Sequence, residues 1–517
     1  MRDYLPLTLG DTLESNARKY PAVPAYIVGE RRLTHGELLQ RGYRLASALE
    51  RVGVRKQDRV SMLAMNCLEY GEVIAACQLS GIIIATVNFR LTPPEMAAII
   101  KDSAPRVLVF EAQYLATIDA LRPQLTDVEH YVCIGAGTDW AQDYESFVAS
   151  GDEAGPSYRA SEADIACLIY TSGTTGKPKG CIWGQREYRQ VAQLVATEQL
   201  NGPGDKALLV MPMFHFGAQA IQLGMHFRGG TVYLHSVFDP AALLAAVVSE
   251  KLTLLHLAPT MVQAVIEQPN IGELDLSSLK TIVYSASAMP SPVLKKGLEL
   301  FGEHVFLQLY GQSESVLTTL RPEQHRPHGS ALDIQRLGSA GQAFPNTLIK
   351  IVDDDGRELP RGEAGEIVVK STAIVRGYWN NDPATLATFR DGWCHTGDMG
   401  RFDDEDFLYL VDRKKDMIIS GGENIYSREV EEAVLAHADV AECAVIGVPD
   451  HKWGEAVCAI VVLRGGRRLE SAALIEFVKT RIASYKKPQQ VIFVDALPKL
   501  PTGKINKVQL RAQYAKS

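Results

Sequence analysis

The pattern of hydrophobic and polar residues predicts an amphipathic helix early in the chain, from Thr34 to Gly53. Thr34 and Glu37 have the spacing of a capping box, in which each side chain binds the other residue's backbone N–H. Glycine often follows the last helical residue, so Gly53 marks the expected end. The apolar face of this helix carries Leu38, Leu45 and Leu49.

After this helix, strand-like and helix-like stretches alternate. Short apolar runs favour buried strands, and apolar residues three or four positions apart favour helices. In chain order the stretches are Arg59–Ala64, Glu69–Ser80, Ile82–Val87, Pro94–Asp102 and Arg106–Phe110. This alternation predicts βαβ units and therefore a mainly parallel sheet with helices on both faces. Ligands of such sheets bind at the carboxyl ends of the strands.

Three later apolar runs continue the α/β pattern, and each stops at a turn. They are Thr253–Leu257, Thr281–Ser285 and Val305–Tyr310. From about Leu348 the pattern changes to hairpins, which predicts a small β-barrel-like region. Its expected strands are Ile349–Val352, Glu366–Lys370, Gly400–Phe402 and Phe407–Val411.

The last hundred residues predict a compact α+β unit. Its expected elements are the helices Ser427–Ala436 and Leu474–Ile482 and the strands Ala441–Val448, Val457–Leu463 and Val491–Val494. The fold class is therefore α/β, with a large N-terminal domain and a smaller C-terminal α+β domain. We expect the domains to comprise residues 1–412 and 413–517. A length of 517 residues agrees with two or more domains, because single cores rarely grow so large.

Composition argues against nucleic acid as a partner and against a zinc site or a disulfide framework. Hydrophobic residues make up 46% and charged residues 22% of the chain, as in globular proteins. The formal net charge is −8 and both signs are mixed along the sequence, so nucleic acid is not expected as a partner. The eight cysteines form no C-x-x-C pair, which indicates neither a zinc site nor a disulfide framework.

The most apolar span and the two ends of the sequence indicate a cytoplasmic protein. The most apolar span, Val73–Val87, contains Gln78 and is too short for a bilayer, so no transmembrane segment is expected. The N-terminus lacks the apolar core of a signal peptide. The chain ends in Lys516-Ser517, which is not a peroxisomal signal. The sequence is also compatible with a homodimer.

The stretch with the strongest chemical character runs from Thr171 to Gly180 and follows the apolar run Ile165–Tyr170. Glycines, hydroxyls and lysines after a buried strand suit the phosphates of a nucleotide. The stretch is not a Walker A loop, because it begins with Thr171 rather than glycine and Pro178 follows the lysine. By composition alone, a flexible surface linker is the alternative.

This stretch resembles the phosphate loop of the adenylate-forming superfamily, which includes acyl-CoA synthetases, adenylation domains of peptide synthetases and beetle luciferases. The resemblance covers nearly the whole chain, because further motifs follow in the family's order. They are Met213-Phe214-His215-Phe216, Tyr310-Gly311-Gln312-Ser313-Glu314, Thr396-Gly397-Asp398, Asp412-Arg413 with Gly421-Gly422-Glu423-Asn424, and Pro501-Thr502-Gly503-Lys504. It implies that a carboxylate attacks ATP to give an acyl-adenylate and pyrophosphate, after which a thiol displaces AMP.

The resemblance implies ATP, Mg²⁺ and coenzyme A as cofactors. The residues carried over for ATP are Thr171, Ser172, Gly173, Thr174, Thr175, Gly176 and Lys177 at the phosphates, Ala286, Ser287 and Ala288 at adenine, Tyr310, Gly311, Gln312 and Ser313, and Asp398 with Arg413 at the ribose. Thr171 and Glu314 would hold the metal, since Mg²⁺ prefers oxygen ligands. Ser313 stands where many members carry threonine, a mild departure.

Each of these positions also has an ordinary structural interpretation. The loop at Ala286 could be a plain turn, Glu314 a surface glutamate, and the Asp398–Arg413 pair a surface salt bridge. The segment Gly311–Ser315 also resembles a hydrolase nucleophile elbow, but that motif requires glycine where Ser315 stands.

The catalytic residues implied are Lys504, His215 and Glu314. Lys504 follows a turn and would bring a cation to the acyl carboxylate and the α-phosphate, although a C-terminal lysine is usually a solvated charge. His215 would lie on the acyl side, although a lone histidine among aromatics is more often a core residue. Candidate acyl-binding residues are Trp183, Phe214, Phe216, Gln222 and Tyr233, which favour a hydrophobic acid, either fatty or aryl.

The family rotates its small domain between the two half-reactions. Lys415 matches the hinge position, and Gly421 and Gly422 would let the pantetheine arm of CoA pass close to the backbone. The expected function is therefore that of an AMP-forming acyl-CoA synthetase. Two alternatives stay open: a stand-alone adenylation domain that loads a carrier protein, and a luciferase-like oxygenase. Because the chain ends soon after Lys504, free CoA is the expected acceptor.

Overall fold

The structure is a computed structural model that describes residues 7–135, 137–171, 178–414, 416–420, 423–451, 453–499 and 505–514. The chain forms two compact units. The first comprises Met1–Leu348 and Lys370–Gly392, and the second comprises Ile349–Val369 and Trp393–Ser517. The domain boundary predicted between residues 412 and 413 falls inside the second unit and stays a prediction.

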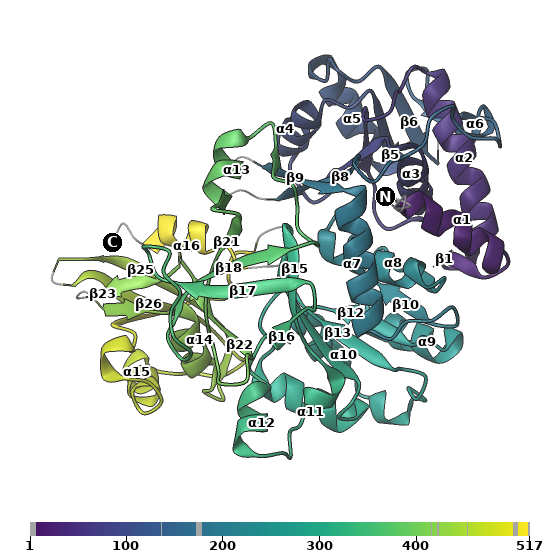
Figure 1. The fold of residues 1–517 in the computed structure, drawn as a ribbon. Coiled ribbons are helices and arrows are strands. Elements are labelled where there is room, and N and C mark those ends of the chain that lie inside the picture. The colour runs from purple at the N-terminus through teal and green to yellow at the C-terminus, as the bar shows by residue number, and fades with distance from the viewer. Residues whose placement is uncertain are drawn as a thin grey trace, which may run out of the picture. The chain divides into compact units, whose positions relative to one another are not determined.

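One sheet of the first unit joins nine of the described strands in the order β16-β15-β14-β13-β12-β10-β11-β1-β2 (Figure 1). The strands from β14 to β1 are parallel to their neighbours, while β2, β15 and β16 are antiparallel additions at the edges. Their bounds are β1 Pro24–Val28, β2 Arg31–Thr34, β10 Lys206–Leu209, β11 Thr231–Leu234, β12 Leu254–Leu257, β13 Thr281–Tyr284, β14 Phe306–Gln312, β15 Ser315–Leu320 and β16 Gln342–Ala343.

A second sheet of the first unit has the order β19-β9-β8-β4-β3-β5-β6-β7. The strands from β8 to β7 are parallel, and β9 and β19 continue the sheet in antiparallel fashion. Their bounds are β3 Arg59–Leu63, β4 Ile83–Thr86, β5 Val107–Glu111, β6 His130–Ile134, β7 Gln142–Asp143, β8 Ile165–Thr171, β9 Lys179–Gly184 and β19 Tyr378–Trp379. The predicted parallel α/β architecture is confirmed.

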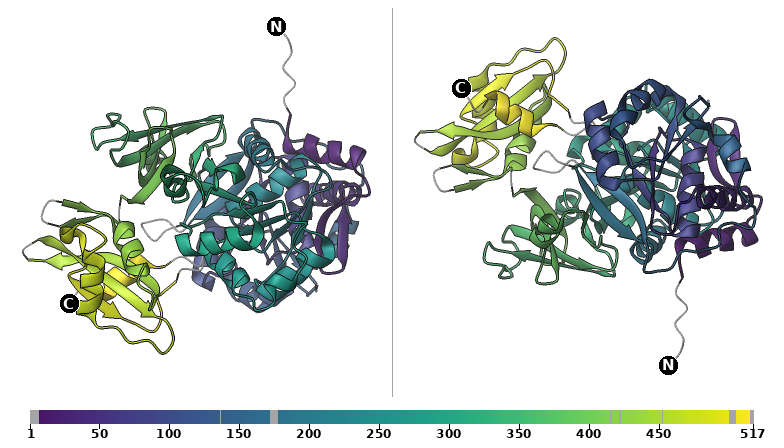
Figure 2. Two further views of the ribbon diagram at one scale, coloured as in Figure 1. Left: turned by 90° about the horizontal axis from the view of Figure 1, so that it is seen from below. Right: turned by 90° about the horizontal axis from the view of Figure 1, so that it is seen from above.

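The two sheets share one helical layer (Figure 1; Figure 2). Side chains from both sheets, such as Val60 and Leu254, belong to one apolar cluster with Val73 of α3, Val191 of α7 and Ile221 of α8. The outer faces pack on α4 and α5 in one sheet and on α9, α10 and α11 in the other. The helices of this unit are α1 Leu9–Lys19, α2 His35–Arg51, α3 Leu68–Ser80, α4 Pro93–Ser103, α5 Leu115–Leu121, α6 Tyr144–Ala149, α7 Gln185–Glu198, α8 Phe216–Phe227, α9 Pro240–Glu250, α10 Pro259–Ile266, α11 Ser291–Phe301, α12 Ala331–Arg336 and α13 Asp382–Thr388.

The helix predicted from Thr34 to Gly53 is α2. The Thr34 Oγ1 accepts from the Glu37 N–H at 3.2 Å, and the Thr34 N–H donates to Glu37 Oε2 at 2.8 Å. The predicted capping box is therefore present. Its leucines at positions 38, 45 and 49 are buried in the shared layer. Val73–Val87 divides into α3 and β4 as expected, and every residue of α3 is buried.

The second unit contains a small sheet in which β17 lies beside β18, and β18 and β22 pair antiparallel with β21. This sheet corresponds to the region for which hairpins and a β-barrel-like arrangement are predicted. The turn at Gly356 closes a tighter hairpin than expected, since Val352 forms a bridge with Glu358 before β18 begins. The bounds are β17 Thr347–Val352, β18 Gly365–Ser371, β21 Trp393–Phe402 and β22 Leu408–Arg413.

The C-terminal part of the second unit is the predicted α+β arrangement. Its sheet has the order β24-β23-β26-β25, with β27 parallel to β26. Val430 of α14 and Leu474 of α15 pack on one face, and Leu510 of α16 packs on the other. The bounds are β23 Ile418–Ser420, β24 Glu423–Ile425, α14 Ser427–Leu435, β25 Val440–Asp450, β26 Gly454–Leu463, α15 Ser471–Lys479, β27 Gln490–Phe493 and α16 Lys507–Tyr514.

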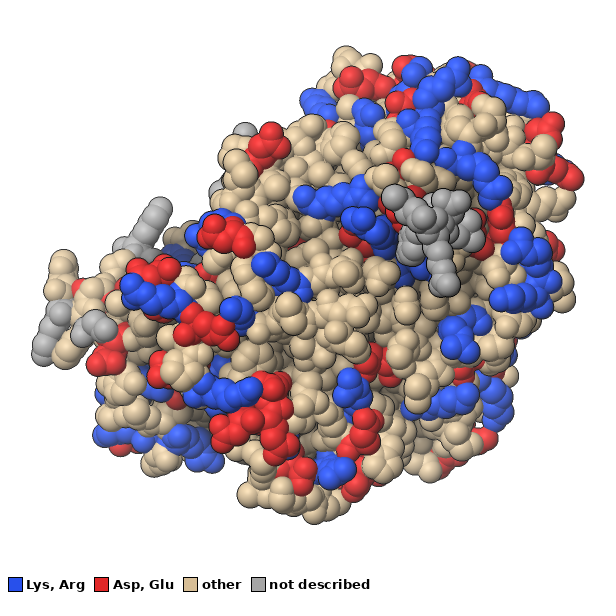
Figure 3. Space-filling model, in the orientation of Figure 1, with Lys and Arg blue, Asp and Glu red and all other residues tan. Residues whose placement is uncertain are grey.

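Two surface properties bear on partners. Within the described residues, no helix has the length and hydropathy needed to cross a membrane. Acidic and basic side chains are interspersed over the face shown in Figure 3.

Candidate active site

Two parallel strands of the first unit, β12 and β13, end side by side at one edge of their sheet, and their neighbour β14 continues beyond them to Gln312. Leu257 is the register partner of Tyr284, which pairs in turn with Gln308. The loop after β13 carries the predicted residues Ala286, Ser287 and Ala288, all of them exposed. Ala286 has a φ of 74°, a left-handed conformation that costs a non-glycine residue energy and is concentrated at functional sites. Small exposed side chains leave this loop open to a flat ring.

The strand that leads to the predicted phosphate loop ends in the other sheet. Thr171 is the last residue of β8 and pairs with Lys179, the first residue of β9. Residues 172–177 lie outside the described part of the chain. The buried strand expected over Ile165–Tyr170 is β8, of which Ala166–Ile169 are buried and both ends are half-buried.

Contacts between side chains join these two edges. The indole Nε1 of Trp183, on β9, donates to the backbone oxygen of Ser313 at 3.0 Å. The Tyr378 hydroxyl, on β19, donates to Oε1 of Glu314 at 2.7 Å. Because β19 pairs with β9, both bonds draw the turn between β14 and β15 toward the strand that follows the phosphate loop. Gly311 permits this turn, because a Cβ there would lie 2.5 Å from the Ser315 oxygen.

Tyr378 fixes the carboxylate predicted to hold Mg²⁺. Burial and the neighbouring Glu314 both raise the pKa of the Tyr378 phenol far above its usual value, so it stays a neutral donor. The ammonium of Lys179 lies 4.9 Å from the centre of the Tyr378 ring. One oxygen of Glu314 is thus engaged by Tyr378, and a carboxylate has a second oxygen to offer a hard cation. Within the described residues, no cluster of three or more metal-ligating side chains is found. Glu314 together with the phosphates of a nucleotide therefore fits Mg²⁺ better than a protein-only metal site.

Aromatic side chains surround the predicted histidine. Phe214 and Phe216 flank His215, the N-cap residue of α8. The Phe214 ring packs edge-on against Phe89 at 5.2 Å. The Phe216 ring stacks on Trp183 with 4.5 Å between centres. His215 itself is half-buried, whereas both phenylalanines are buried. Two aromatic pairs, Phe89 with Phe214 and Phe216 with Trp183, thus lie next to His215 in the chain, and Phe89, Phe214 and Phe216 are called the aromatic wall below.

The remaining candidate acyl-binding residues differ in position. Trp183 is fully buried and contributes to the wall only by stacking on Phe216. Gln222 is buried and lies 2.9 Å from Nδ1 of His226. The structure does not bring Tyr233 to the wall, because Tyr233 packs in the cluster beneath α9, on the opposite face of the sheet. The reason is the two-residue period of β11, in which Val232 and Leu234 face α8 instead.

The predicted ribose pair is adjacent in the second unit. Asp398 on β21 and Arg413 on β22 are register partners, and Oδ1 of Asp398 lies 3.1 Å from Nε of Arg413. The Asp398 N–H donates to Thr396 Oγ1 at 3.1 Å. Gly397 between them has a φ of 71°, a conformation that favours glycine. The motif thus holds the Asp398 carboxylate at a sharp turn.

Several predicted residues lie outside the described parts of the chain. They are Ser172, Gly173, Thr174, Thr175, Gly176, Lys177, Lys415, Gly421, Gly422 and Lys504. Their assignments stay predictions, as do the roles of the residues placed above.

Sequence reasoning missed three residues at these edges: Tyr378, His256 and Ser285. A signal for Tyr378 exists in the sequence, because the glycine before it indicates a turn, and Gly377 indeed has a φ of 141°. His256 is a polar residue inside the apolar run Leu254–Leu257, and such an exception could have been noticed. Ser285 could not be distinguished from other residues of its loop.

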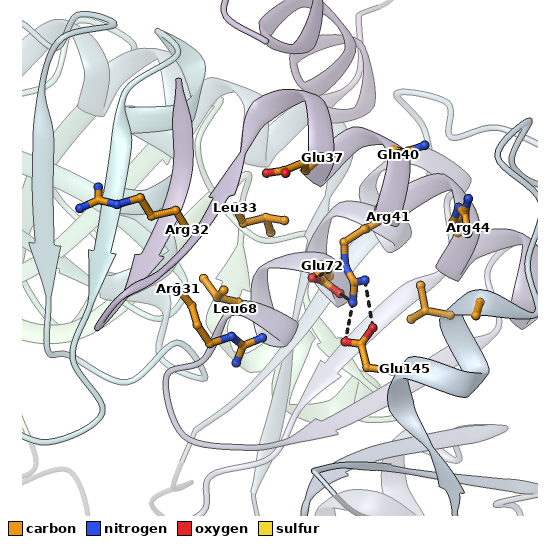
Figure 4. Close-up of a pocket in the computed structure, with 12 residues that line it drawn as sticks. Arg31, Arg32, Leu33, Glu37, Gln40, Arg41, Arg44, Leu68, Glu72 and Glu145 are labelled. Carbon is orange, nitrogen blue, oxygen red and sulfur yellow. Dashed lines mark hydrogen bonds and ion pairs between the residues drawn. The ribbon is translucent and has the colours of Figure 1, made fainter. Parts of the chain in front are cut away.

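A separate cavity of about 490 Å³ lies between β2, α2, α3 and α6 (Figure 4). Its arginines are matched by glutamates: Arg41 contacts Glu72 at 2.6 Å and Glu145 at 2.8 Å, and Arg31 contacts Glu69 at 2.6 Å. The cavity shares no lining residue with the predicted site. Its cations are already neutralised by the protein, so it is a poor anion site.

Comparison with known families decides the identity of this arrangement. The profile of AMP-binding enzymes matches residues 13–379, and that of their C-terminal domain matches residues 429–504. The chain belongs to the AMP-binding enzyme family. Its predicted resemblance to adenylate-forming enzymes is therefore confirmed, and the family match spans both units.

Curated relatives of this AMP-binding enzyme are similar over nearly their whole length. A feruloyl-CoA synthase of an Amycolatopsis species is 37% identical, covering 98% of this chain and 99% of the relative. An indoleacetate–CoA ligase of Aromatoleum aromaticum is 35% identical, covering 99% of each. A long-chain-fatty-acid–CoA ligase of Mycobacterium tuberculosis is 33% identical, covering 98% of each.

Solved structures show the same fold. An anthranilate CoA ligase in complex with anthranoyl-AMP has a TM-score of 0.90 and 27% identity, covering 99% of this chain and 98% of that one. An amide bond synthetase of Marinactinospora thermotolerans has a TM-score of 0.88 and 28% identity, covering 98% and 100%. The expected α/β fold with a smaller C-terminal part is thus the fold of this AMP-binding enzyme.

Proposed function

We propose that this AMP-binding enzyme is an acyl-CoA synthetase that activates a hydrophobic carboxylic acid, aryl or fatty, with ATP and transfers it to coenzyme A. One observation carries the proposal. Glu314 is held by Tyr378 at the edge where the phosphate loop begins, in the same unit as His215 and its aromatic wall. A carboxylate placed to hold a metal and a wall of aromatic side chains would serve a reaction between ATP and a hydrophobic acid. CoA ligases among the relatives support the same activity.

In the first half-reaction the acid's carboxylate oxygen bonds to the α-phosphorus and pyrophosphate leaves. Negative charge gathers at phosphorus, so cations and N–H donors must converge there. We assign Lys504 to the α-phosphate and the acyl carboxylate, and residues Thr171 to Lys177 to the departing phosphates. Mg²⁺, held by Thr171 and Glu314, would supply charge neutralisation. Asp398 and Arg413 would anchor the ribose, while Ala286–Ala288 would lie against adenine.

In the second half-reaction the CoA thiol loses its proton to solvent, its sulfur bonds to the acyl carbon, and AMP leaves with the electrons of the broken acyl–oxygen bond. We assign the passage of the pantetheine arm to Gly421 and Gly422. His215, next to Phe214 and Phe216 in the chain, would close on the carboxylate end of the acid. The aromatic wall of Phe89, Phe214 and Phe216 would bury the acid's apolar body, and each buried CH₂ favours binding by about 0.8 kcal/mol.

We place the reaction in the cytoplasm. All eight cysteines lie in the described residues, are buried, and form no disulfide. Reduced thiols are typical of that compartment. The enzyme would act on small molecules as a monomer or as a homodimer.

The test is a panel of aryl, phenylpropenoic and fatty acids offered with ATP, Mg²⁺ and CoA. Pyrophosphate and free thioester are both measured, and the same panel is run with Lys504→Ala. We expect thioester from at least one hydrophobic acid, and a loss of about 100-fold or more in adenylate formation in the variant. Formation of adenylate without free thioester would instead favour an adenylation domain that loads a carrier protein. Light emission with an oxidisable luciferin would favour a luciferase-like oxygenase.

A further inference from the structure

A histidine and a serine meet beneath the candidate acyl site. His256 lies in the middle of β12 and is only 1% exposed. Its Nε2 lies 2.8 Å from the hydroxyl oxygen of Ser285, the first residue after β13. Ser285 is half-buried and opens the exposed loop Ala286–Ala288. The pair therefore connects the core of the sheet to the edge where a ligand is expected.

The period of the strands directs this pair toward α8. Leu254 and Val283 belong to the apolar layer that contains α8, whereas Leu255 and Tyr284 belong to the opposite face. Two residues further along each strand, His256 and Ser285 return to the α8 side. A Cβ on Gly217, in the first turn of α8, would lie 3.4 Å from Cε1 of His256. The pair thus lies on the same face of the sheet as Phe216 and the N-cap residue His215.

Burial of the His256 ring decides which of its two nitrogens carries the proton and donates to Ser285. Burial lowers the pKa of His256 to about 4, so its ring is neutral near pH 7 and carries one proton. Among the described residues, Nδ1 is buried and has no hydrogen-bond partner. A buried N–H without an acceptor is costlier than an unused lone pair, so the proton belongs on Nε2. Nε2–H then donates to Ser285 Oγ, which leaves the serine's own O–H for another acceptor.

We propose that Ser285, oriented by His256, donates a hydrogen bond to an oxygen substituent on the acyl group, so that the enzyme prefers oxygenated aryl or keto acids over unsubstituted hydrocarbon acids. The proposal rests on the proposed function. Ser285 is a specificity-determining residue and His256 a positioning residue. Within the described part of the chain, the Ser285 hydroxyl has no partner besides His256.

The preference follows from what each acid does to the hydroxyl. When an oxygenated acid binds, it covers the Ser285 hydroxyl and accepts a hydrogen bond from it. This bond replaces the one that the hydroxyl made to water before binding. A hydrocarbon acid covers the same hydroxyl and leaves it without an acceptor. Leaving a buried donor without an acceptor costs more free energy than forming one hydrogen bond gains. Sites built to bind a substrate hydrogen-bonding group reject analogues that lack it for this reason.

The test uses two stable acyl-adenylate mimics in which a sulfamate replaces the phosphate. One carries the feruloyl group and the other the cinnamoyl group, which lacks the ring oxygens. Calorimetry gives the ratio of their dissociation constants for the wild-type enzyme and for Ser285→Ala. We expect the wild type to favour the feruloyl mimic about tenfold, and Ser285→Ala to abolish most of that preference while binding the cinnamoyl mimic at least as tightly.

His256 is tested by replacing its donor. His256→Gln keeps an N–H that can reach Ser285, and His256→Leu does not. We expect the preference to survive in His256→Gln and to fall in His256→Leu, with thermal unfolding as a check of folding. Ser277→Ala, in the exposed loop before β13, is the matched control.

The outcomes separate this inference from the proposed function. Equal binding of both mimics by the wild type overturns the inference even when thioester forms. An equal loss for both mimics in Ser285→Ala also overturns it, because Ser285 would then contact the shared adenylate. Absence of thioester with every acid, while the mimics still differ about tenfold in affinity, would refute the proposed function and leave the inference supported.

Discussion

At the scale of single residues, the candidate site depends on a phenol that orients a carboxylate. The Tyr378 hydroxyl donates to Glu314 at 2.7 Å, and this is a hydrogen bond to a charged acceptor. Such bonds contribute about 1.5–3 kcal/mol. A carboxylate that loses this partner can rotate, and its remaining oxygen is then less well placed for a cation.

Tyr378→Phe is expected to raise the Mg²⁺ concentration needed for half-maximal adenylation by about tenfold, because Glu314 loses its orienting donor. Pyrophosphate exchange across a Mg²⁺ titration measures this. Tyr131→Phe, on a different strand edge, is the control. An unchanged Mg²⁺ titration would show that Tyr378 does not act through Glu314.

At the scale of elements, the shared helical layer sets a steric limit on α3. Gly71 lies within α3, and a Cβ there would be 2.4 Å from the ring of Tyr26 on β1. Tyr26 is buried and only 1% exposed, so its ring has no room to move aside. The absent side chain lets α3 approach β1 this closely.

Gly71→Ala is expected to destabilise the first unit by about 1–3 kcal/mol through overpacking, although alanine favours helices by about 1 kcal/mol over glycine. Thermal unfolding of the full chain, compared with wild type, measures the change. Gly272→Ala is the matched control, because a Cβ there meets no atom within 4 Å. A stabilised Gly71→Ala would mean that Tyr26 and α3 can separate.

At the scale of the whole molecule, four buried imidazoles predict sensitivity to acid. Burial lowers the pKa of His226 to about 3 and those of His256 and His325 to about 4, and it also lowers the pKa of His35. The unfolded chain takes up protons near pH 6.5, where the folded chain cannot. The free energy of unfolding should therefore fall from about pH 6.5 down to pH 4. Glu72, whose pKa burial raises, opposes this trend.

The thermal midpoint is expected to fall steadily over this interval, and more slowly in His226→Gln, which removes one titrating group. The slope against pH is the decisive quantity, because the substitution also changes stability at every pH. A midpoint that stays flat between pH 6.5 and 5 would contradict the assignment of neutral buried histidines.

The two half-reactions give a second prediction for the whole molecule. Lys504 and the Gly421-Gly422 loop would have to reach one acyl carbonyl in turn, which requires rotation about the link at Lys415. Proline fixes φ near −65°, within about 15°. Lys415→Pro is expected to retain adenylation and to lose most thioester formation. Pyrophosphate exchange and CoA consumption are measured on one preparation; parallel loss of both would indicate misfolding, and retention of both would place the hinge elsewhere.

The sequence by itself determined the elements and the motif residues. The capping box of α2 and the buried strand β8 follow from local patterns, because caps and apolar runs involve residues close in the chain, whereas the pairing of Asp398 with Arg413 was expected from the family resemblance. The tertiary structure alone decided which distant residues meet. Strand register and face direct Tyr233 away from the aromatic wall, bring Tyr378 to Glu314 and pair His256 with Ser285. These contacts depend on how strands are ordered across a sheet, and a period of two residues carries no information about that order.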